Sequence, residues 1–271
     1  MPRPVVLDCD TGTDDAVAIM MAALHPALEL LGVCCVFGNH PVEQTTANTR
    51  RVLAAIGCGE VPVLPGAPAA GAEESAAVDW LVALLRRTPE PVTVVATGPL
   101  TDIAAALRRD PTLAQAVEEL VVMGGNFTVE VAGPVERNTG DDPAALATVL
   151  AAGLRRLVLV PLDATYQAPM GAAEISALRA LGTPAATLAA GCVEERIEVY
   201  RSVPGMDGRA PVHDPLTIGH LLDPAVVQLS PRRVAVDRTG RTSLVDGAAN
   251  ALVALGCDAP RFRDLLLRTL G

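Results

Sequence analysis

The 271-residue chain has no lysine, so all 21 of its basic residues are arginines. A phosphate-binding Walker A loop and a Schiff-base mechanism both depend on a lysine amine, and the sequence therefore excludes both. The 31 acidic residues leave a net charge of −10. Because an acidic chain repels a phosphate backbone, this composition argues against a nucleic-acid partner.

Paired cysteines and long apolar runs are also absent. The six cysteines form no CxxC pair, and a chain of this length needs no disulfide framework, so we expect reduced core residues. The chain runs from Met1 directly into the apolar segment Val5–Leu7 without a signal peptide, and no apolar run is long enough to span a bilayer. We therefore expect a cytoplasmic protein without a membrane partner.

Short β-branched segments alternate with longer amphipathic segments along almost the whole chain. The expected strands are Pro4–Asp8, Glu29–Val36, Pro91–Ala96, Leu120–Met123, Leu157–Leu162 and Leu252–Leu255. The expected helices are Asp14–Leu24, Val42–Ile56, Ser75–Arg87, Thr101–Arg108, Pro143–Ala152, Gly171–Leu181, Pro184–Tyr200, Asp214–Leu222 and Ala259–Leu270. This alternation predicts an α/β fold with a mostly parallel, doubly wound central sheet flanked by helices, in which residues 1–271 form a single domain.

Two segments depart from this alternation. Val226–Val245 contains three short β-like pieces separated by Pro231 and Gly240, which predicts an antiparallel addition to the sheet. Pro62–Gly71 is rich in Pro, Gly and Ala and is expected to be a surface loop.

Four carboxylates follow the first expected strand within eight residues: Asp8, Asp10, Asp14 and Asp15. Capping of the next helix explains one or two acids, not four, and so many like charges repel one another unless a cation lies among them. The oxygen ligands indicate Ca²⁺ or Mg²⁺, and a flexible loop that supplies several oxygens favours Ca²⁺. Ile19 occupies the position at which an EF-hand needs a glutamate, which excludes that motif. The sequence thus predicts a cation site at the carboxyl end of this strand.

The pair Asp8 and Asp10 after an apolar strand is also similar to the start of the haloacid dehalogenase phosphatases. In that family the first Asp is the nucleophile, and a Lys or Arg holds the phosphoryl group. Because this chain has no lysine, an arginine would have to hold it here.

A longer motif gives a closer resemblance. Residues 7–16 read Leu-Asp-Cys-Asp-Thr-Gly-Thr-Asp-Asp-Ala and resemble the DxDxGxDD signature of the inosine–uridine-preferring nucleoside hydrolases. Further segments follow in the order found in that family: Phe37–Asn39, Ala96–Thr101, Val122–Gly125, Glu136–Asn138, Pro161–Thr165 and Val212–Leu216. The resemblance covers nearly the whole chain and implies hydrolysis of the N-glycosidic bond of ribonucleosides, which releases free base and ribose.

The resemblance also implies a calcium site that activates water. Asp10, Asp15 and Asp214 are implied to bind Ca²⁺ through their carboxylates, and Thr97 through its main-chain carbonyl oxygen. A cation held in this way lowers the pKa of a bound water and can hold two vicinal hydroxyls. Asp10 is further implied to be the general base that takes the proton of that water.

The residues implied to hold the ribose are Asp14, Asn39 and Asn138 at the 2′- and 3′-hydroxyls, Glu136 near the 5′ end, and Met123 against the sugar. His213 matches a histidine near the leaving base in one branch of the family, where it would donate a proton or a hydrogen bond. Asp8 is expected either to be structural or to support the ligands from behind.

The sequence departs from the family pattern in three places. The segment Pro65–Ser75 is short and has no His, whereas the family usually carries a His- and Gly-rich loop there that covers the sugar. Arg137 stands where an aromatic residue is common, which leaves open a substrate with a charged group. The chain has only one Trp, two Tyr and three Phe, of which Tyr166, Tyr200 and Phe127 are expected near the pocket.

Three functions remain as hypotheses. The first is a calcium-dependent ribonucleoside hydrolase with a small-molecule nucleoside substrate, which by resemblance is expected to form a homodimer or homotetramer. The second is a haloacid-dehalogenase-type phosphatase that uses Asp8 and Mg²⁺. The third is a non-catalytic protein that binds a nucleoside or ribose and keeps the metal.

Overall fold

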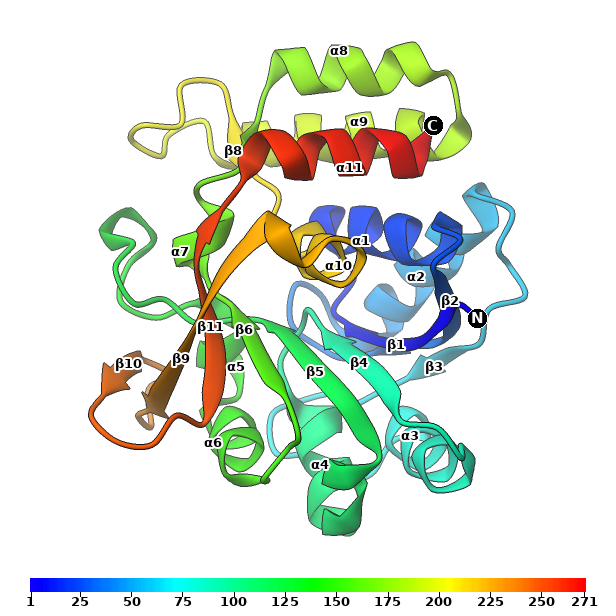
Figure 1. The fold of residues 1–271 in the computed structure, drawn as a ribbon. Coiled ribbons are helices and arrows are strands. Elements are labelled where there is room, and N and C mark those ends of the chain that lie inside the picture. Colours follow the sequence, from blue (N-terminus) through cyan, green and yellow to red (C-terminus); the bar gives the residue numbers. More distant parts are fainter.

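The computed structural model, which describes residues 1–271, is built around a nine-stranded sheet with the order β10-β9-β11-β6-β5-β4-β1-β2-β3 (Figure 1). Strands β1 to β6 and β11 pair in parallel, and β9 and β10 are antiparallel to their neighbours. The strands are β1 Arg3–Cys9, β2 Leu28–Cys35, β3 Val63–Pro65, β4 Val92–Ala96, β5 Val117–Met123, β6 Leu157–Val160, β9 Val227–Val236, β10 Thr242–Val245 and β11 Ala251–Cys257.

Helices cover both faces of the sheet (Figure 1). One face carries α1 Thr13–Leu24, α2 Val42–Ala55, α8 Ala172–Leu181, α9 Pro184–Val199, α10 Pro215–Leu222 and α11 Ala259–Leu270. The other face carries α3 Ala76–Arg87, α4 Thr101–Arg109 and α6 Pro143–Ala151. Successive residues of β1 point alternately to the two faces, so Val5 and Leu7 belong to the first core and Val6 to the second. The predicted α/β fold, with its mostly parallel, doubly wound sheet and single domain, is therefore confirmed.

The antiparallel addition predicted for Val226–Val245 is present, but as two strands, β9 and β10, not as three pieces. Pro231 lies inside β9, where it pairs with Leu252 of β11. It is tolerated because β10 pairs only with residues 233–236, so this part of β9 has a free edge that needs no N–H donor.

The prediction of a surface loop at Pro62–Gly71 is partly wrong, because Val63–Pro65 forms the edge strand β3 beside β2. A second small sheet, formed by Pro169–Met170 (β7) and Ala210–Pro211 (β8), and the one-turn helices α5 Arg137–Asp141 and α7 Leu162–Thr165 were not expected. All of these elements are too short to show a periodic pattern. Among the helices, none combines the length and the apolar character required to cross a membrane.

The strand order reverses between β1 and β4. From β1 the chain proceeds to β2 and β3 on one side, and from β4 to β5 and β6 on the other. The loops that follow β1 and β4 therefore diverge and leave a crevice at the carboxyl ends of these strands. Asp10 follows β1 and Thr97 follows β4, so the fold brings both to this crevice.

Candidate active site

A cavity of about 560 Å³ lies at the carboxyl ends of the strands. Of the residues expected in the site, those that line it are Asp14, Asn39, Thr97, Met123, Glu136, Asn138, His213 and Asp214. Asp10 and Asp15 are buried just behind this surface, where they accept hydrogen bonds from the backbone amides of Asn39 and Gly12. The structure thus gathers the residues expected to bind metal and ribose, together with His213, around one cavity.

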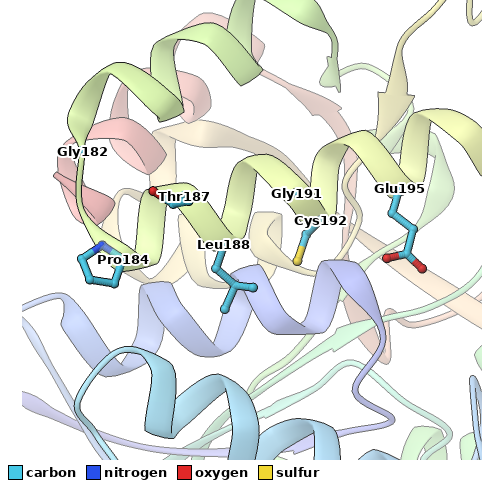
Figure 2. Close-up of a pocket in the computed structure, with 7 residues that line it drawn as sticks. All are labelled: Gly182, Pro184, Thr187, Leu188, Gly191, Cys192 and Glu195. Carbon is cyan, nitrogen blue, oxygen red and sulfur yellow. The ribbon is translucent and has the colours of Figure 1, made fainter.

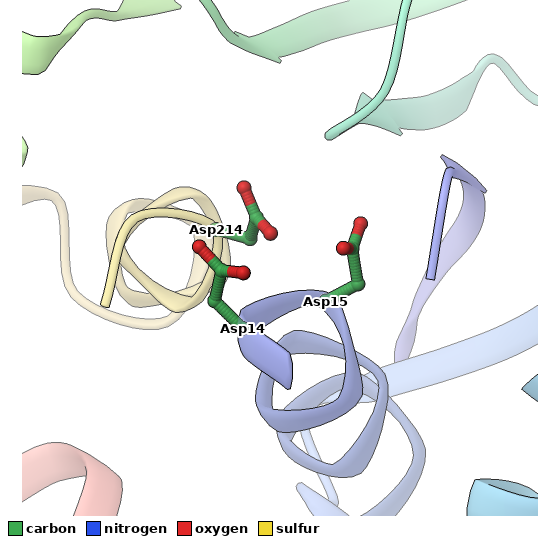
Figure 3. Close-up of side chains that lie close together, drawn as sticks. All are labelled: Asp14, Asp15 and Asp214. Atoms are coloured by element: carbon green, nitrogen blue, oxygen red, sulfur yellow. The ribbon is translucent and has the colours of Figure 1, made fainter. Parts of the chain in front are cut away.

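Three buried carboxylates meet at one side of the cavity. Asp14 and Asp15 lie in the first turn of α1, and Asp214 immediately precedes α10 (Figure 3). Oxygen atoms of the three side chains lie within 4.8 Å of one another. Burial raises the pKa of Asp214 well above its ordinary value, and the nearby charges of Asp14 and Asp15 raise it further. Such a group of oxygens is costly without a cation and suits a hard divalent one.

Asp10 is held beside this group by the loop after β2. Its Oδ2 atom accepts a hydrogen bond from the Asn39 amide at 2.6 Å, while its Oδ1 atom is enclosed and has no protein partner. Gly38 makes this approach possible, because a Cβ atom there would lie 2.2 Å from Asp10 Oδ2. Burial and the charge of Asp15 raise the pKa of Asp10 well above its ordinary value. The free, buried Oδ1 atom therefore fits a ligand that the protein itself does not supply, such as a cation or its water.

Asp15 is the most firmly held of the acids. Its Oδ2 atom accepts from the Gly12 amide at 2.9 Å and from Asn39 Nδ2 at 3.4 Å, and its Oδ1 atom accepts from the Thr97 hydroxyl at 2.8 Å. Burial and the charge of Asp14 raise the pKa of Asp15 to about 6, although these hydrogen bonds oppose the rise. Asp15 thereby links the loops that follow β1, β2 and β4.

The opposite side of the cavity is organised by Glu136 and Asn138. Glu136 begins the short helix α5, and its carboxylate accepts hydrogen bonds from the backbone amides of Asn138, Thr139 and Gly125 at 2.7 to 3.1 Å. The side-chain amide of Asn138 donates to the Thr97 carbonyl oxygen at 2.7 Å. The main-chain oxygen expected to bind metal is thus already directed toward the cavity wall.

His213 is neutral in this environment. Its Nδ1 atom lies 2.7 Å from the Thr165 hydroxyl and its Nε2 atom lies 2.9 Å from the Tyr200 hydroxyl. Burial and the positive charge of Arg196 lower the pKa of His213 to about 3. Both ring nitrogens of His213 therefore have partners in the protein, and burial raises the pKa of the Tyr200 hydroxyl, so Tyr200 keeps its proton near neutral pH.

Arg196 belongs to the cavity wall, and the sequence reasoning missed it. Its Nη1 atom lies 3.2 Å from Asp14 Oδ1, and its Cζ atom lies 5.2 Å from the centre of the Tyr200 ring. The ion pair joins residues 182 positions apart. One signal was available, because Arg196 and Tyr200 are four residues apart at the end of an expected helix and so share a face.

Two expected residues lie elsewhere. Phe127 lines a separate cavity between the loop that follows β5 and strand β10, so its assignment to the pocket is wrong. Asp8 does not line the active-site cavity, and both of its carboxylate oxygens are enclosed by the protein without a partner. A buried Asp8 cannot attack a phosphate ester, which excludes the phosphatase hypothesis in the form that uses it as nucleophile.

A second, more open hollow of about 740 Å³ follows α9 from Gly182 to Glu195 (Figure 2). Its one thiol belongs to Cys192, and burial raises the pKa of that thiol to about 12. A thiol with this pKa is not a nucleophile near neutral pH. This hollow therefore offers no nucleophilic thiol.

The chain is similar in sequence and structure to known nucleoside hydrolases. The model of the family described as inosine-uridine preferring nucleoside hydrolase matches residues 5–264. The pyrimidine-specific ribonucleoside hydrolase RihA of Citrobacter koseri is 31% identical over 308 residues, which cover 100% of this chain and 98% of that protein.

Solved structures agree with this match. A purine-preferring ribonucleoside hydrolase from Gardnerella vaginalis is 28% identical, has a TM-score of 0.90, and is matched over 99% of this chain and 98% of its own. A plant nucleoside hydrolase with 24% identity and a TM-score of 0.91, matched over 100% of this chain and 99% of its own, shares the fold. The chain belongs to the inosine–uridine-preferring nucleoside hydrolase family.

Proposed function

We propose that this nucleoside hydrolase is calcium-dependent and cleaves the N-glycosidic bond of ribonucleosides by the attack of an activated water. The observation that carries the proposal is the convergence of buried carboxylates from the loop after β1, the first turn of α1 and the residue before α10, beside one cavity that also contains an aromatic wall. The oxygen-only donor set supports Ca²⁺ as the cation.

The proposed ligands are the carboxylates of Asp10, Asp15 and Asp214 and the main-chain carbonyl of Thr97. The unpartnered Oδ1 atom of Asp10 and the proximity of Asp15 to Asp214 support this set. When bound, Ca²⁺ supplies charge that lowers the pKa of a coordinated water and holds vicinal hydroxyls. Asp14 is the fourth carboxylate at the site, and its ion pair with Arg196 balances its charge without a metal.

The protein groups around the cation have distinct proposed roles. Asp10 takes the proton from the attacking water. Asp14, Asn39 and Asn138 bind the 2′- and 3′-hydroxyls, because all three line the cavity and carry side-chain groups that can form hydrogen bonds with them. They position C1′ of the ribose for attack.

The remaining proposed contacts are at the two ends of the nucleoside. Glu136 lies near the 5′ end and Met123 packs against the sugar, and both line the cavity. The base rests against the aromatic wall formed by Tyr166, Tyr200 and His213, whose ring centres lie 5.7 to 6.1 Å apart. His213 supports the departing base through its hydrogen bond with Tyr200.

An assay of free ribose and free base tests the proposal. The purified protein is offered inosine, adenosine, guanosine, uridine and cytidine with Ca²⁺, with chelator, and with Ca²⁺ restored. We expect release that chelator abolishes and Ca²⁺ restores. Restoration by Mg²⁺ but not by Ca²⁺ would contradict the choice of metal, and tight nucleoside binding without release would favour the binding-protein hypothesis.

The role of Asp10 has its own test. Asp10→Asn keeps the shape of the side chain but removes the base, so we expect kcat to fall by at least about 100-fold. Asp8→Asn is the matched control, because it makes the same change two residues earlier, outside the cavity, and should keep activity. Equal losses in the two variants would show that general disruption of β1, not loss of the base, explains the effect.

Location and assembly complete the proposal. The family resemblance implies a homodimer or homotetramer, and we expect this assembly to lie in the cytoplasm. Light scattering on the purified protein distinguishes these two assemblies from a monomer.

A further inference from the structure

Arg196 is the cation that lies largely buried in the wall of the active-site cavity. Its side chain is 15% exposed, whereas that of Arg137 at the rim is 60% exposed. The guanidinium lies over the Tyr200 ring, which faces Tyr166 and His213 in the aromatic wall. Because a planar base packs best on such a wall, Arg196 stands at the base end of the cavity.

The contacts of Arg196 fix the guanidinium but leave donors free. Its Nε atom donates to the Pro211 carbonyl at 3.3 Å, and its Nη1 atom donates to Asp14 Oδ1 at 3.2 Å. A guanidinium has five N–H donors, so three remain, and none of its nitrogens is both enclosed and without a partner. Nη2 therefore has no partner in the protein and is not enclosed, and because Arg196 lines the cavity, its donors are free for a ligand there.

Cleavage of the N-glycosidic bond places negative charge at this end of the cavity. The oxygen of water forms a bond to C1′, its proton passes to a carboxylate, and the C1′–N bond breaks with both electrons on the base nitrogen. The base leaves as an anion whose charge spreads onto its ring carbonyl oxygens, and it takes up a proton afterwards. Both ring nitrogens of His213 already have partners in the protein, so neither is free to contact that anion directly.

We propose that Arg196 is a catalytic residue that contacts the departing base and stabilises the negative charge on it as the bond breaks. This inference rests on the proposed function. A cation held by Asp14 and Pro211 in a largely buried position needs no reorganisation when charge develops, and such preorganised charges contribute strongly to catalysis. Arg196 also ties the base end of the cavity to Asp14 at its sugar end.

Two substrates distinguish stabilisation of the departing base by Arg196 from positioning of Asp14 by Arg196. Uridine has a poor leaving group that needs stabilisation, whereas 4-nitrophenyl β-D-ribofuranoside releases a nitrophenolate that is stable without help. Both substrates place the same ribose beside Asp14. In Arg196→Met, with Ca²⁺ present, we expect kcat/KM for uridine to fall about 100-fold more than kcat/KM for the nitrophenyl riboside.

A purely structural role would give a different result. If Arg196 only positions Asp14, both substrates lose the same factor, and this outcome would overturn the inference. Arg196→Gln carries the test if the Met variant fails to fold, because its neutral amide can still donate to Asp14; we expect the same uridine-selective loss. The matched control is Arg179→Met, which removes an arginine paired with Glu194 at 2.7 Å outside the cavity and should affect neither substrate.

The wild-type protein distinguishes failure of this inference from failure of the proposed function. If it releases ribose from neither uridine nor any other nucleoside, the proposed function is overturned, and the inference with it. If it cleaves uridine and the nitrophenyl riboside, but neither Arg196 variant shows the selective loss, only the role of Arg196 is overturned.

Discussion

The acidic side chains of the site are arranged for a ligand that carries positive charge. Burial raises the pKa values of Asp10, Asp15 and Asp214, and the charge of Asp14 nearby raises all three further. A divalent cation offsets the cost of ionising these buried carboxylates, because it favours the ionised form of each ligand. Its binding therefore releases protons. The same burial lowers the pKa of His213, and the site thus separates a group of acids from a neutral imidazole.

Among the four acids of the motif in residues 7–16, Asp8 is the one whose carboxylate oxygens both lack a hydrogen-bond partner and do not reach the cavity. Its carboxylate is fully enclosed, and burial together with the charge of Asp102 raises its pKa well above the ordinary value. In the unfolded chain Asp8 ionises near pH 4, whereas in the fold it stays protonated to a higher pH, so it lowers stability progressively as the pH rises above 4. We expect Asp8→Asn, which cannot ionise, to gain stability relative to the wild type between pH 4.5 and pH 8 in urea unfolding.

A matched comparison checks this explanation. Asp79→Asn changes an exposed acid on α3, and its stability relative to the wild type should vary little with pH. If Asp8→Asn follows the same pH course as Asp79→Asn, the burial of an unpaired Asp8 carboxyl is not costly, and the prediction is wrong.

At the scale of elements, the segment after β3 is fixed in place and does not cover the site. Asp102 accepts hydrogen bonds from the Ala67 amide at 3.0 Å and from the Ser75 hydroxyl at 2.8 Å. Asp142 accepts one from the Gly71 amide at 3.1 Å. None of the residues from Pro65 to Ser75 lines the active-site cavity. In this chain the segment connects β3 to α3, and the cavity is formed without it.

Ser75 joins this segment to α3. Its hydroxyl oxygen accepts from the Val78 amide at 3.0 Å as the N-cap of the helix, and its proton goes to Asp102. We expect Ser75→Ala to lower the free energy of unfolding by about 1 to 2 kcal/mol, as the loss of an N-cap does. Ser176→Ala on α8 is the control, because that exposed hydroxyl bonds only a helical carbonyl and should change stability by less than about 0.5 kcal/mol. Equal effects in urea unfolding would contradict the role of Ser75.

The features that the sequence could predict are those determined by residues close together in the chain. The strands β1 and β4 and the second half of β5 are apolar runs, and Asp10, Asp14 and Asp15 lie close together where β1 leads into α1, so both were predictable from neighbours in the chain. The pairing of Arg196 with Asp14 depends on how α9 packs beside α1, across 182 residues, and no local pattern indicates it. The three residues of β3 are too few for a pattern, and only pairing with β2 makes them a strand.

At the scale of the whole molecule, a buried acid links several elements at the end of the sheet opposite the active site. Glu119, near the start of β5, lies 2.5 Å from Arg156 Nε, 3.2 Å from His220 Nε2 and 3.5 Å from Arg3 Nη1. These groups come from the starts of β1 and β5, the turn before β6, and the last turn of α10. His220 is thus part of a buried polar cluster.

This cluster should make stability depend on pH in acid. Burial opposes ionisation of Glu119, but the hydrogen bonds and charges of His220 and Arg156 outweigh it and lower its pKa from 4.5 to about 2. A lowered acid pKa stabilises the fold above the unfolded value, near pH 4.5, and that contribution is lost as the pH falls toward 2. We expect Glu119→Gln to lower the free energy of unfolding by about 3 kcal/mol at pH 7, with the difference from wild type shrinking below pH 4.5.

Glu118→Gln provides the comparison for this prediction. Glu118 precedes Glu119 in β5, but its side chain is 54% exposed and lies 3.9 Å from Arg155, so its loss should cost less than about 1 kcal/mol at any pH. Urea unfolding of the three proteins at pH 7, 4 and 3 measures both differences. If Glu119→Gln is as destabilising at pH 3 as at pH 7, its cost comes from packing and not from the carboxylate charge. If the destabilisation caused by Glu119→Gln instead becomes smaller as the pH falls, the carboxylate charge is what stabilises the contacts of Glu119. Those contacts join β1, β5, α10 and the turn before β6 at the end of the sheet remote from the catalytic acids.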